Sequence, residues 1–239
     1  MVYLFYLFQK LIDKIKYMRI SNFKLNTGLY TFANPGSYFL IKKLLDSSSY
    51  NNQFTVCADG VSLVILENLF NKNTISRYSF DYTSIADEVF SFCVEQEKRV
   101  SIVGTTDENI GVFVDFLKNK YTNINISLFS SGFFKSDLER SQLIRNIADR
   151  KVDVVVVGMG SPYQEKFLID LSNYGWKGYG FTCGGFIDQT VMKGEKYYPD
   201  IVNKLNLRWL YRLFKEPQRL AYRYLIIYPF FLLKYLRSI

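Results

Sequence analysis

Three segments of the chain share one order of features: a short apolar run, a turn with glycine, and then a helical pattern. The clearest apolar run is Val152–Val157. Apart from Asp153 the run is uniformly apolar, which is typical of a central strand in a parallel sheet that is covered on both faces. The other two runs begin at Val100 and near Lys177. Because strands that alternate with helices form parallel sheets, we predict an α/β fold with a Rossmann-like, mostly parallel sheet flanked by helices.

The sequence predicts where the helix after the Val152–Val157 run begins. Ser161 is suited to cap its N-terminus, Pro162 to fill its first position, and Gln164 to complete a capping box. Near the C-terminus we expect a helix from about residue 199 to 214, an interruption at Pro217, and a second helix from about residue 218.

Charge divides the chain into two parts. The net charge of the 239 residues is +8, and residues 204–239 alone contain eight basic residues, one acid and nine aromatic residues. The preceding part is nearly neutral. We therefore predict an α/β core at 1–203, with an amphipathic N-terminal segment at 1–20, and a basic, aromatic-rich helical appendage at 204–239.

Missing residue types exclude several classes of chemistry. The chain has no histidine, which excludes Ser-His triads, Cys-His pairs and histidine metal sites. Its three cysteines are far apart, so no Cys-x-x-Cys pair exists. Their odd number argues against a disulfide framework, and a reducing compartment fits best. A P-loop motif, a complete dinucleotide fingerprint and an Asp-x-Asp pair are also missing. We therefore expect no cofactor and no metal ion.

The two ends of the chain are apolar but short. The first uncharged run has nine residues and no cleavage site after it, so a signal peptide is a poor interpretation. The longest uncharged run near the C-terminus, Tyr224–Leu233, contains Pro229, whereas a spanning helix needs about 20 apolar residues. Both ends are suited to lie on a bilayer rather than to cross it.

Four glycine-containing loops follow the expected strands, at the edge where parallel sheets bind ligands. Glycine allows close approach to the backbone, and helix N-termini attract phosphate. The alternative is that these glycines are ordinary turn residues, and a single loop does not decide between the two interpretations. The loops are Asp59-Gly60, Gly104-Thr105-Thr106, Gly158-Met159-Gly160-Ser161 and Gly184-Gly185.

Asp59 is the strongest candidate for a catalytic carboxylate. It follows an apolar run at Phe54–Ala58 that is typical of a strand, and a helical pattern covers Val61–Phe70 after it. A carboxylate at the ligand edge of a sheet is able to take a proton from an acceptor hydroxyl. An Asp that caps the next helix is an equally good interpretation of the same pattern.

Five cations in the basic appendage recur at helical spacing, within an arc of about 80°. They fit a solvated helix face, a contact with anionic phospholipid worth about 1 kcal/mol per cation, or arginine forks on a diphosphate. Nucleic acid is the less favoured partner, because the core lacks a basic groove. The five cations are Arg208, Arg212, Lys215, Arg219 and Arg223.

Together, the segments from Thr31 to Arg223 resemble the WecG/TagA/CpsF family of bacterial glycosyltransferases (glycosyltransferase family 26). Four motifs carry the resemblance in the same order along the chain. They are Cys57-Ala58-Asp59-Gly60 (family N-A-D-G), Gly158 to Lys166 (family G-x-G-S-P-x-Q-E-K), Gly184 to Asp188, and Leu207 to Leu213 with Glu216 to Leu220 (family L-E-W-L-Y-R-L…E-P-x-R-L).

The resemblance implies an inverting, metal-independent transfer of a sugar from a UDP-sugar. The sugar would be of the N-acetylmannosamine type or another hexose. The acceptor would be a sugar linked through diphosphate to a polyprenol, in the synthesis of a surface polysaccharide or wall polymer. Asp59 matches the presumed general base of the family. Asn34 matches an Asn near the substrate pocket, Gln164 matches a Gln of the pocket, and Arg77 loosely matches the Arg of a family R-x-x-G-x-D segment. Tail arginines would close over the diphosphates.

The resemblance and the loops together define the candidate substrate-binding residues. They are Asn34, Arg77, Gly104, Gly158, Gly160, Ser161, Gln164, Glu165, Gly184, Gly185, Asp188, Arg212, Arg219 and Arg223. We expect a cytoplasmic protein, peripheral on the inner face of the membrane. The alternative is a non-catalytic nucleotide- or lipid-binding peripheral protein. The sequence leaves open whether the protein forms a homo-oligomer.

Overall fold

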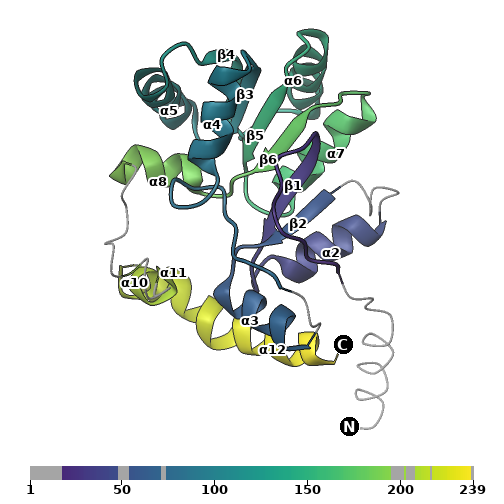
Figure 1. The fold of residues 1–239 in the computed structure, drawn as a ribbon, viewed down its shortest axis with the longest axis vertical. Coiled ribbons are helices and arrows are strands. Elements are labelled where there is room, and N and C mark those ends of the chain that lie inside the picture. Colours follow the sequence, from purple (N-terminus) through teal and green to yellow (C-terminus); the bar gives the residue numbers. More distant parts are fainter. Residues whose placement is uncertain are drawn as a thin grey trace.

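The computed structural model describes residues 18–47, 54–70, 74–194, 202, 208–215 and 217–237. Within these ranges, six strands form one sheet in the order β2-β1-β6-β5-β3-β4 (Figure 1). All of its strand pairs are parallel, which confirms the predicted α/β class. The strands are β1 (Gly28–Ala33), β2 (Phe54–Ala58), β3 (Arg99–Gly104), β4 (Asn125–Ser130), β5 (Val154–Gly158) and β6 (Tyr179–Thr182).

Helices cover both faces of the sheet. The helices between strands are α2 (Tyr38–Ser47), α3 (Val61–Phe70), α4 (Ala86–Glu95), α5 (Asp107–Lys120), α6 (Asp137–Asp149) and α7 (Tyr163–Asn173). After β6 come α8 (Phe186–Lys193), α10 (Arg208–Lys215), α11 (Pro217–Tyr222), the π-helix η1 (Arg223–Ile227) and α12 (Tyr228–Leu236).

The position of β5 explains its uniformly apolar sequence. Val155 and Val157 lie in the apolar cluster that contains residues of α2, α6 and α7, whereas Val154 and Val156 lie in the cluster that contains residues of α4, α5 and α8. All four valines are fully buried. Because both faces of a central parallel strand are covered, every position along it is apolar.

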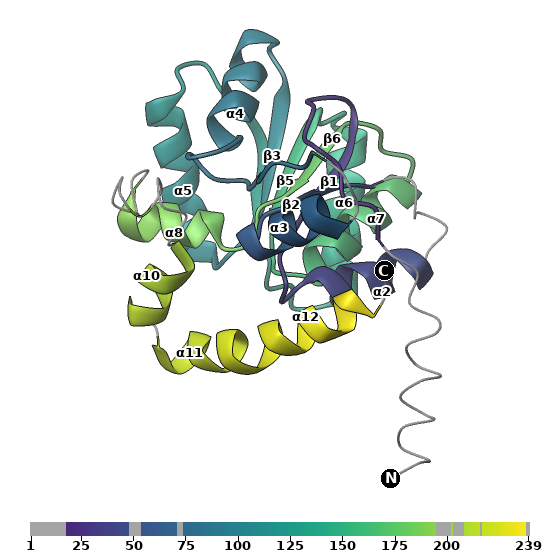
Figure 2. The same ribbon diagram turned by 60° about the horizontal axis from the view of Figure 1, so that its bottom comes forward.

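The end of the C-terminal tail packs on the core. Phe231 and Tyr235 of α12 are buried, and both rings contact the ring of Tyr38 at the start of α2. The Tyr235 hydroxyl donates a 2.8 Å hydrogen bond to Oε1 of Glu67 on α3. Figure 2 shows α12 alongside α2 and α3. Residues 204–239 therefore include a helix that packs against the core. The predicted domain boundary between residues 203 and 204 stays a prediction.

The opposite side of the tail is apolar and exposed. Leu225 is 70% exposed and Leu233 is 58% exposed. The other large apolar side chains exposed along α11, η1 and α12 are Tyr222, Ile226, Phe230, Leu232 and Leu236. The described helices include none that is both long and apolar enough to traverse a bilayer. The predicted N-terminal segment lies, as far as residue 17, outside the described residues.

Candidate active site

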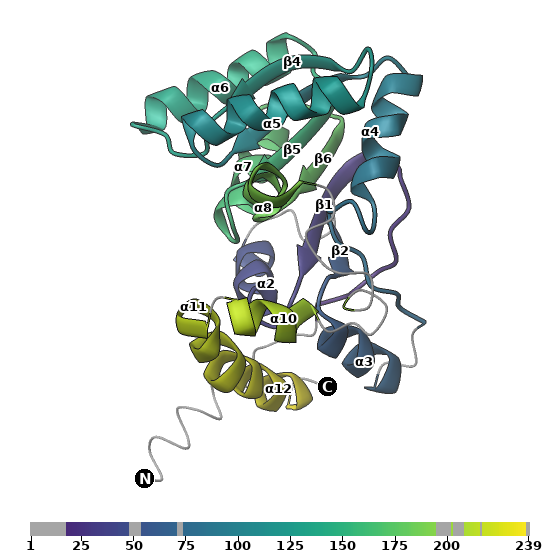
Figure 3. The ribbon, with the colours of Figure 1, turned by 90° about the vertical axis from the view of Figure 1, so that its left-hand side faces the viewer.

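The loops after the six strands meet at the carboxyl edge of the sheet, where ligands bind in folds of this kind. The tail helices lie on the same side of the molecule, where α2, α3 and α8 begin (Figure 3). The candidate residues that precede the tail lie there in or beside three hydrogen-bonded groups, which are described in turn.

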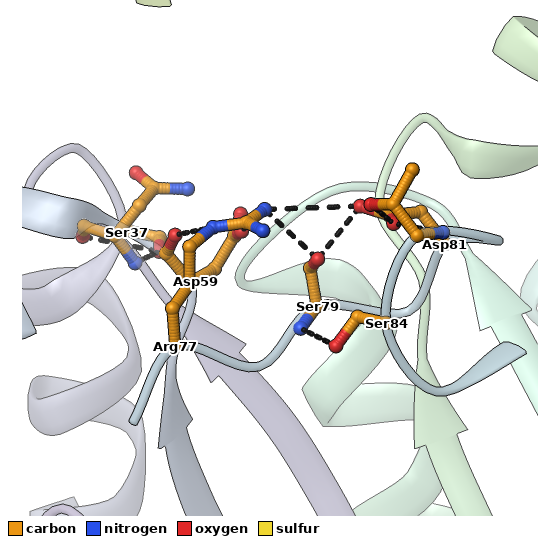
Figure 4. Close-up of polar contacts among 8 residues, drawn as sticks. Ser37, Asp59, Arg77, Ser79, Asp81 and Ser84 are labelled. Atoms are coloured by element: carbon orange, nitrogen blue, oxygen red, sulfur yellow. Dashed lines mark hydrogen bonds and ion pairs between the residues drawn. The ribbon is translucent and has the colours of Figure 1, made fainter. Parts of the chain in front are cut away.

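The first group is an ion pair between Asp59 and Arg77. Arg77 Nη2 lies 2.8 Å from Asp59 Oδ1, and Arg77 Nε donates a 2.8 Å hydrogen bond to the Asp59 carbonyl oxygen (Figure 4). An isolated bridge between Ala58 and Arg77 brings the two segments together. The Asp59 side chain is 33% exposed. A neighbouring guanidinium favours the charged form of a carboxylate, which is the form that a general base requires.

Arg77 is itself held by two further side chains. Its Nη2 donates to Ser79 Oγ at 2.9 Å and lies 3.7 Å from Asp81 Oδ2. Ser79 Oγ in turn donates a 2.6 Å hydrogen bond to Asp81 Oδ2 (Figure 4). Ser79 and Asp81 are both buried. The short segment from 77 to 81 therefore fixes the guanidinium where it meets Asp59.

Asn34 lies next to Asp59 because β1 and β2 are neighbours. The Asp59 amide donates to the Ala33 carbonyl at 2.8 Å, and Asn34 is the following residue. Asn34 Oδ1 accepts a 2.9 Å hydrogen bond from the Gly36 amide. A Cβ atom on Gly60 would lie 2.7 Å from Pro35 Cδ. The loop after β1 and the loop after β2 thus pack so closely that a side chain at position 60 would collide with Pro35, which favours glycine after Asp59.

The second group surrounds Glu165 and corrects the predicted capping box. The α7 helix begins at Tyr163 with Pro162 at its N-cap position and no side-chain cap. Ser161 Oγ instead donates to Glu165 Oε1 at 2.9 Å, and Gln164 Nε2 donates to Ser161 Oγ at 3.2 Å. The Ser161–Pro162 peptide bond is cis. The capping box was wrong because the buried Glu165 carboxylate, which a local pattern does not reveal, takes the serine hydroxyl.

Gln164 connects two of the glycine loops. Its Oε1 accepts a 3.1 Å hydrogen bond from the Gly184 amide, and its Nε2 donates to Glu165 Oε1 at 3.1 Å. Gly160 and Gly184 have φ values of +75° and +54°, a region that favours glycine. Gly185 is the N-cap residue of α8. The structure therefore brings the predicted 158–161 and 184–185 loops together.

The third group joins the loop after β3 to α8. Asp188 accepts hydrogen bonds from Thr105 Oγ1 and, at 2.9 Å, from Asn109 Nδ2. Gly104 lies against the next strand end, since a Cβ atom on it would be 2.4 Å from the Gly158 carbonyl oxygen. Asp188 is thus bonded within the protein, and its predicted contact with substrate stays a prediction.

Replacing Gly104 with Ala is expected to lower the free energy of unfolding by about 2–3 kcal/mol. Gly104 has a φ of +152°, and the strand ends must separate to admit a methyl group. Urea denaturation measures the change. The control is Gly111, inside α5, where an added Cβ atom would meet no other atom within 4 Å. Gly111→Ala should stabilise the protein by about 0.5–1 kcal/mol, and equal effects at both positions would contradict the prediction.

The cysteines near the site are not nucleophiles. Burial raises the pKa of the Cys57 thiol to about 12, and burial also raises the pKa of Cys183 above its usual range. Both therefore remain protonated at neutral pH, whereas a cysteine nucleophile must be a thiolate. Since the chain has no histidine, a carboxylate remains as the candidate base, and the assignment of that role to Asp59 stays a prediction.

Two predictions about the site stay predictions. The side chains of Arg212, Arg219 and Arg223, and that of Arg208, lie outside the described part of the structure, so their predicted contact with diphosphates is untested. Metal-independent chemistry is untested as well. In the part of the chain that is described, no three His, Cys, Asp or Glu side chains form a group suited to a metal ion.

Several residues of the site were not among the predicted ones. Thr31 and Thr182 lie near the ends of strands. The Thr31 hydroxyl donates to Glu165, and the Thr182 hydroxyl donates to that of Thr31. Ser79 and Asp81 hold Arg77. A polar residue in an otherwise apolar strand, as at Thr31, is the signal that was available in the sequence.

Comparison with known proteins identifies the class of enzyme. The chain matches the Glycosyl transferase WecG/TagA/CpsF family over residues 9–239. It therefore belongs to this family, which confirms the resemblance, and it is a glycosyltransferase.

Three relatives illustrate the range of the family. The chain is 36% identical over 212 residues to the UDP-Gal:alpha-D-GlcNAc-diphosphoundecaprenol beta-1,4-galactosyltransferase of Shigella boydii, a match that covers 88% of the chain and 86% of the relative. It is 29% identical over 178 residues to the N-acetylglucosaminyldiphosphoundecaprenol N-acetyl-beta-D-mannosaminyltransferase of Bacillus subtilis (strain 168), with 74% of the chain and 64% of that relative covered. The enzyme of that name from Staphylococcus aureus (strain MW2) is 26% identical over 197 residues, with 82% and 72% covered.

Proposed function

We propose that the protein transfers a hexose from a UDP-sugar to a hydroxyl of a sugar linked through diphosphate to a polyprenol, with inversion and without a metal ion. The observation that carries the proposal is an accessible carboxylate, Asp59, held by Arg77 at the ligand edge of the sheet in a member of this family. The 36% identical relative is named for transfer of galactose to GlcNAc-diphosphoundecaprenol, which supports this acceptor class and makes UDP-galactose the first donor to test.

In the proposed reaction, Asp59 removes the proton from the acceptor hydroxyl as its oxygen attacks the anomeric carbon. The bond between that carbon and the β-phosphate oxygen breaks on the opposite face, and UDP leaves with the electron pair. The departing diphosphate needs positive charge. The N-termini of α5, α7 and α8 at the carboxyl edge, together with tail arginines, are the groups that we propose for it.

We also propose that the protein is peripheral on the inner face of the cytoplasmic membrane. The exposed apolar side of η1 and α12 supports this location, since a helix that lies in a bilayer surface presents such a side to the lipid. Residues 217–237 contain four basic residues and no acid, a charge that suits an anionic lipid surface.

The test is a product analysis by mass spectrometry. The full-length protein is incubated with a panel of UDP-hexoses and UDP-N-acetylhexosamines, a short-chain polyprenyl-diphospho-GlcNAc, and EDTA. One donor should add a single sugar to the acceptor, and NMR of the product should show a β-linkage, because the donors are α-linked. An α-linkage would contradict inversion, and loss of product only with EDTA would contradict metal independence. If no donor gives a product but UDP-sugars or lipid still bind, the non-catalytic alternative is favoured.

A further inference from the structure

Glu165 is a fully buried carboxylate at the centre of the carboxyl edge. Three side-chain donors converge on its Oε1: Thr31 Oγ1 at 2.7 Å, Ser161 Oγ at 2.9 Å and Gln164 Nε2 at 3.1 Å. Its exposed fraction is 0%, so this side chain does not contact solvent. Such a convergence of donors suits a charged acceptor, because hydrogen bonds to ionised groups are roughly twice as strong as neutral ones.

These hydrogen bonds link two halves of the site. One half consists of the loops after β1 and β2, with Asp59, and the other consists of the glycine loops after β5 and β6. Thr31 is on β1, two residues before the strand ends, and the end of β1 holds Asp59 through the Ala33 carbonyl. Ser161 belongs to the loop after β5, and Gln164 binds the Gly184 amide in the loop after β6. Glu165 therefore adds a side-chain link between the half with the base and the half with the glycine loops, beside the β1–β6 strand pairing and the Thr182–Thr31 hydrogen bond.

A buried carboxylate in this position is costly for folding. Glu165 takes part in none of the ion pairs found among the described residues, and its Oε2 has no hydrogen-bond partner there. Burial of a charge without an opposite charge is unfavourable. A neutral amide of the same shape would cost less to bury, so stability alone does not account for a glutamate here.

We propose that Glu165 is a positioning residue of the transfer reaction. Through Thr31, Ser161 and Gln164 it sets the placement of the half with Asp59 relative to the glycine loops, where the UDP-sugar donor is proposed to bind. The inference rests on the proposed sugar transfer. Each half binds its own substrate without Glu165, but the acceptor hydroxyl and the anomeric carbon align only when the halves are held in register. Misplacement of reacting atoms by an ångström costs about a hundredfold in rate.

The test is Glu165→Gln, which keeps the shape of the side chain and weakens all three hydrogen bonds. We expect kcat to fall about tenfold to a hundredfold while KM for the UDP-sugar changes less than about twofold and the melting temperature stays the same or rises. A purely structural role would lower kcat and the melting temperature together, and that result would overturn the proposal. An unchanged kcat would overturn it as well.

A second pair of variants separates this role from a general effect of altered packing. Thr31→Val removes one donor to Glu165, and Thr190→Val makes the same change at a buried threonine of α8 whose hydroxyl has no partner among the described residues. Only Thr31→Val should lower kcat, and equal loss in both variants would contradict the proposal. Absence of transfer by the wild-type protein would instead contradict the proposed function, so the two failures are distinct.

Discussion

Replacement of Asp59 with Asn is expected to lower kcat/KM for sugar transfer about a thousandfold, because an amide is unable to accept the proton of the acceptor hydroxyl. Removal of a general base typically costs a factor of about 10²–10⁴, and a thousandfold loss corresponds to about 4 kcal/mol of transition-state stabilisation. The rate is measured with a short-chain polyprenyl-diphospho-sugar, and UDP binding is measured separately by calorimetry. UDP binding should survive, since Asp59 faces the acceptor in the proposed reaction.

The matched control is Asp115→Asn, the same chemical change on an exposed position of α5. It should leave kcat/KM within about twofold, as surface substitutions away from a site usually do. Thermal unfolding of the Asp59 variant is needed as well, because Asn keeps an acceptor oxygen for Arg77 but removes the negative charge of the ion pair. Full activity of Asp59→Asn would remove Asp59 from the mechanism, and Asp81, which also faces Arg77, would be the next carboxylate to test.

The parts of the fold that could be predicted are those with a strong local signal. The predicted strand at 54–58 and helix at 61–70 coincide with β2 and α3. These segments combine a continuous apolar run with a glycine turn. By contrast, β1 and β4 were not predicted. β1 contains Thr31, whose burial depends on Glu165, and β4 is an edge strand with partly exposed positions.

The sequence offered candidate site residues one by one, but it did not predict how they are arranged. Asp59 and Arg77 are 18 positions apart in the chain, and the isolated bridge at Ala58 brings them together. The capping box failed for a similar reason. A local rule assigns the Ser161 hydroxyl to the helix backbone, but Glu165, buried beneath it by the packing of α7 on the sheet, competes successfully for the same hydroxyl. Tertiary partners of this kind leave no periodic signal in a sequence.

The structure sharpens the charge pattern of the basic tail. The five cations at helical spacing fitted a solvated face, lipid or diphosphate. The structure adds an apolar side, because α12 buries Phe231 and Tyr235 against the core and turns Phe230 and Leu233 outward, as η1 does with Leu225. A solvated helix would present polar residues there. The exposed apolar side is what the proposed lipid contact requires, and the contact itself stays a proposal.

Replacement of both Leu225 and Leu233 with Glu is expected to reduce binding to vesicles that contain phosphatidylglycerol about a hundredfold or more. Burial of a leucine side chain in an apolar phase contributes about 1.5–3 kcal/mol, and a carboxylate at the same place is also repelled by anionic lipid. Because both leucines are mostly exposed in the folded protein, the melting temperature should change little. Co-sedimentation with vesicles of graded phosphatidylglycerol content measures the loss.

The matched control is the pair Val112→Glu and Leu138→Glu, two exposed apolar positions on α5 and α6, helices that lie far from α12 in Figure 1. This pair adds the same two charges but should leave vesicle binding unchanged. Equal loss in both pairs would mean that net charge alone controls binding, and no loss in either would place the lipid contact elsewhere. Activity on a short-chain acceptor should survive the Leu225 and Leu233 changes, because in the proposed arrangement the exposed side of the tail contacts lipid and not the substrates.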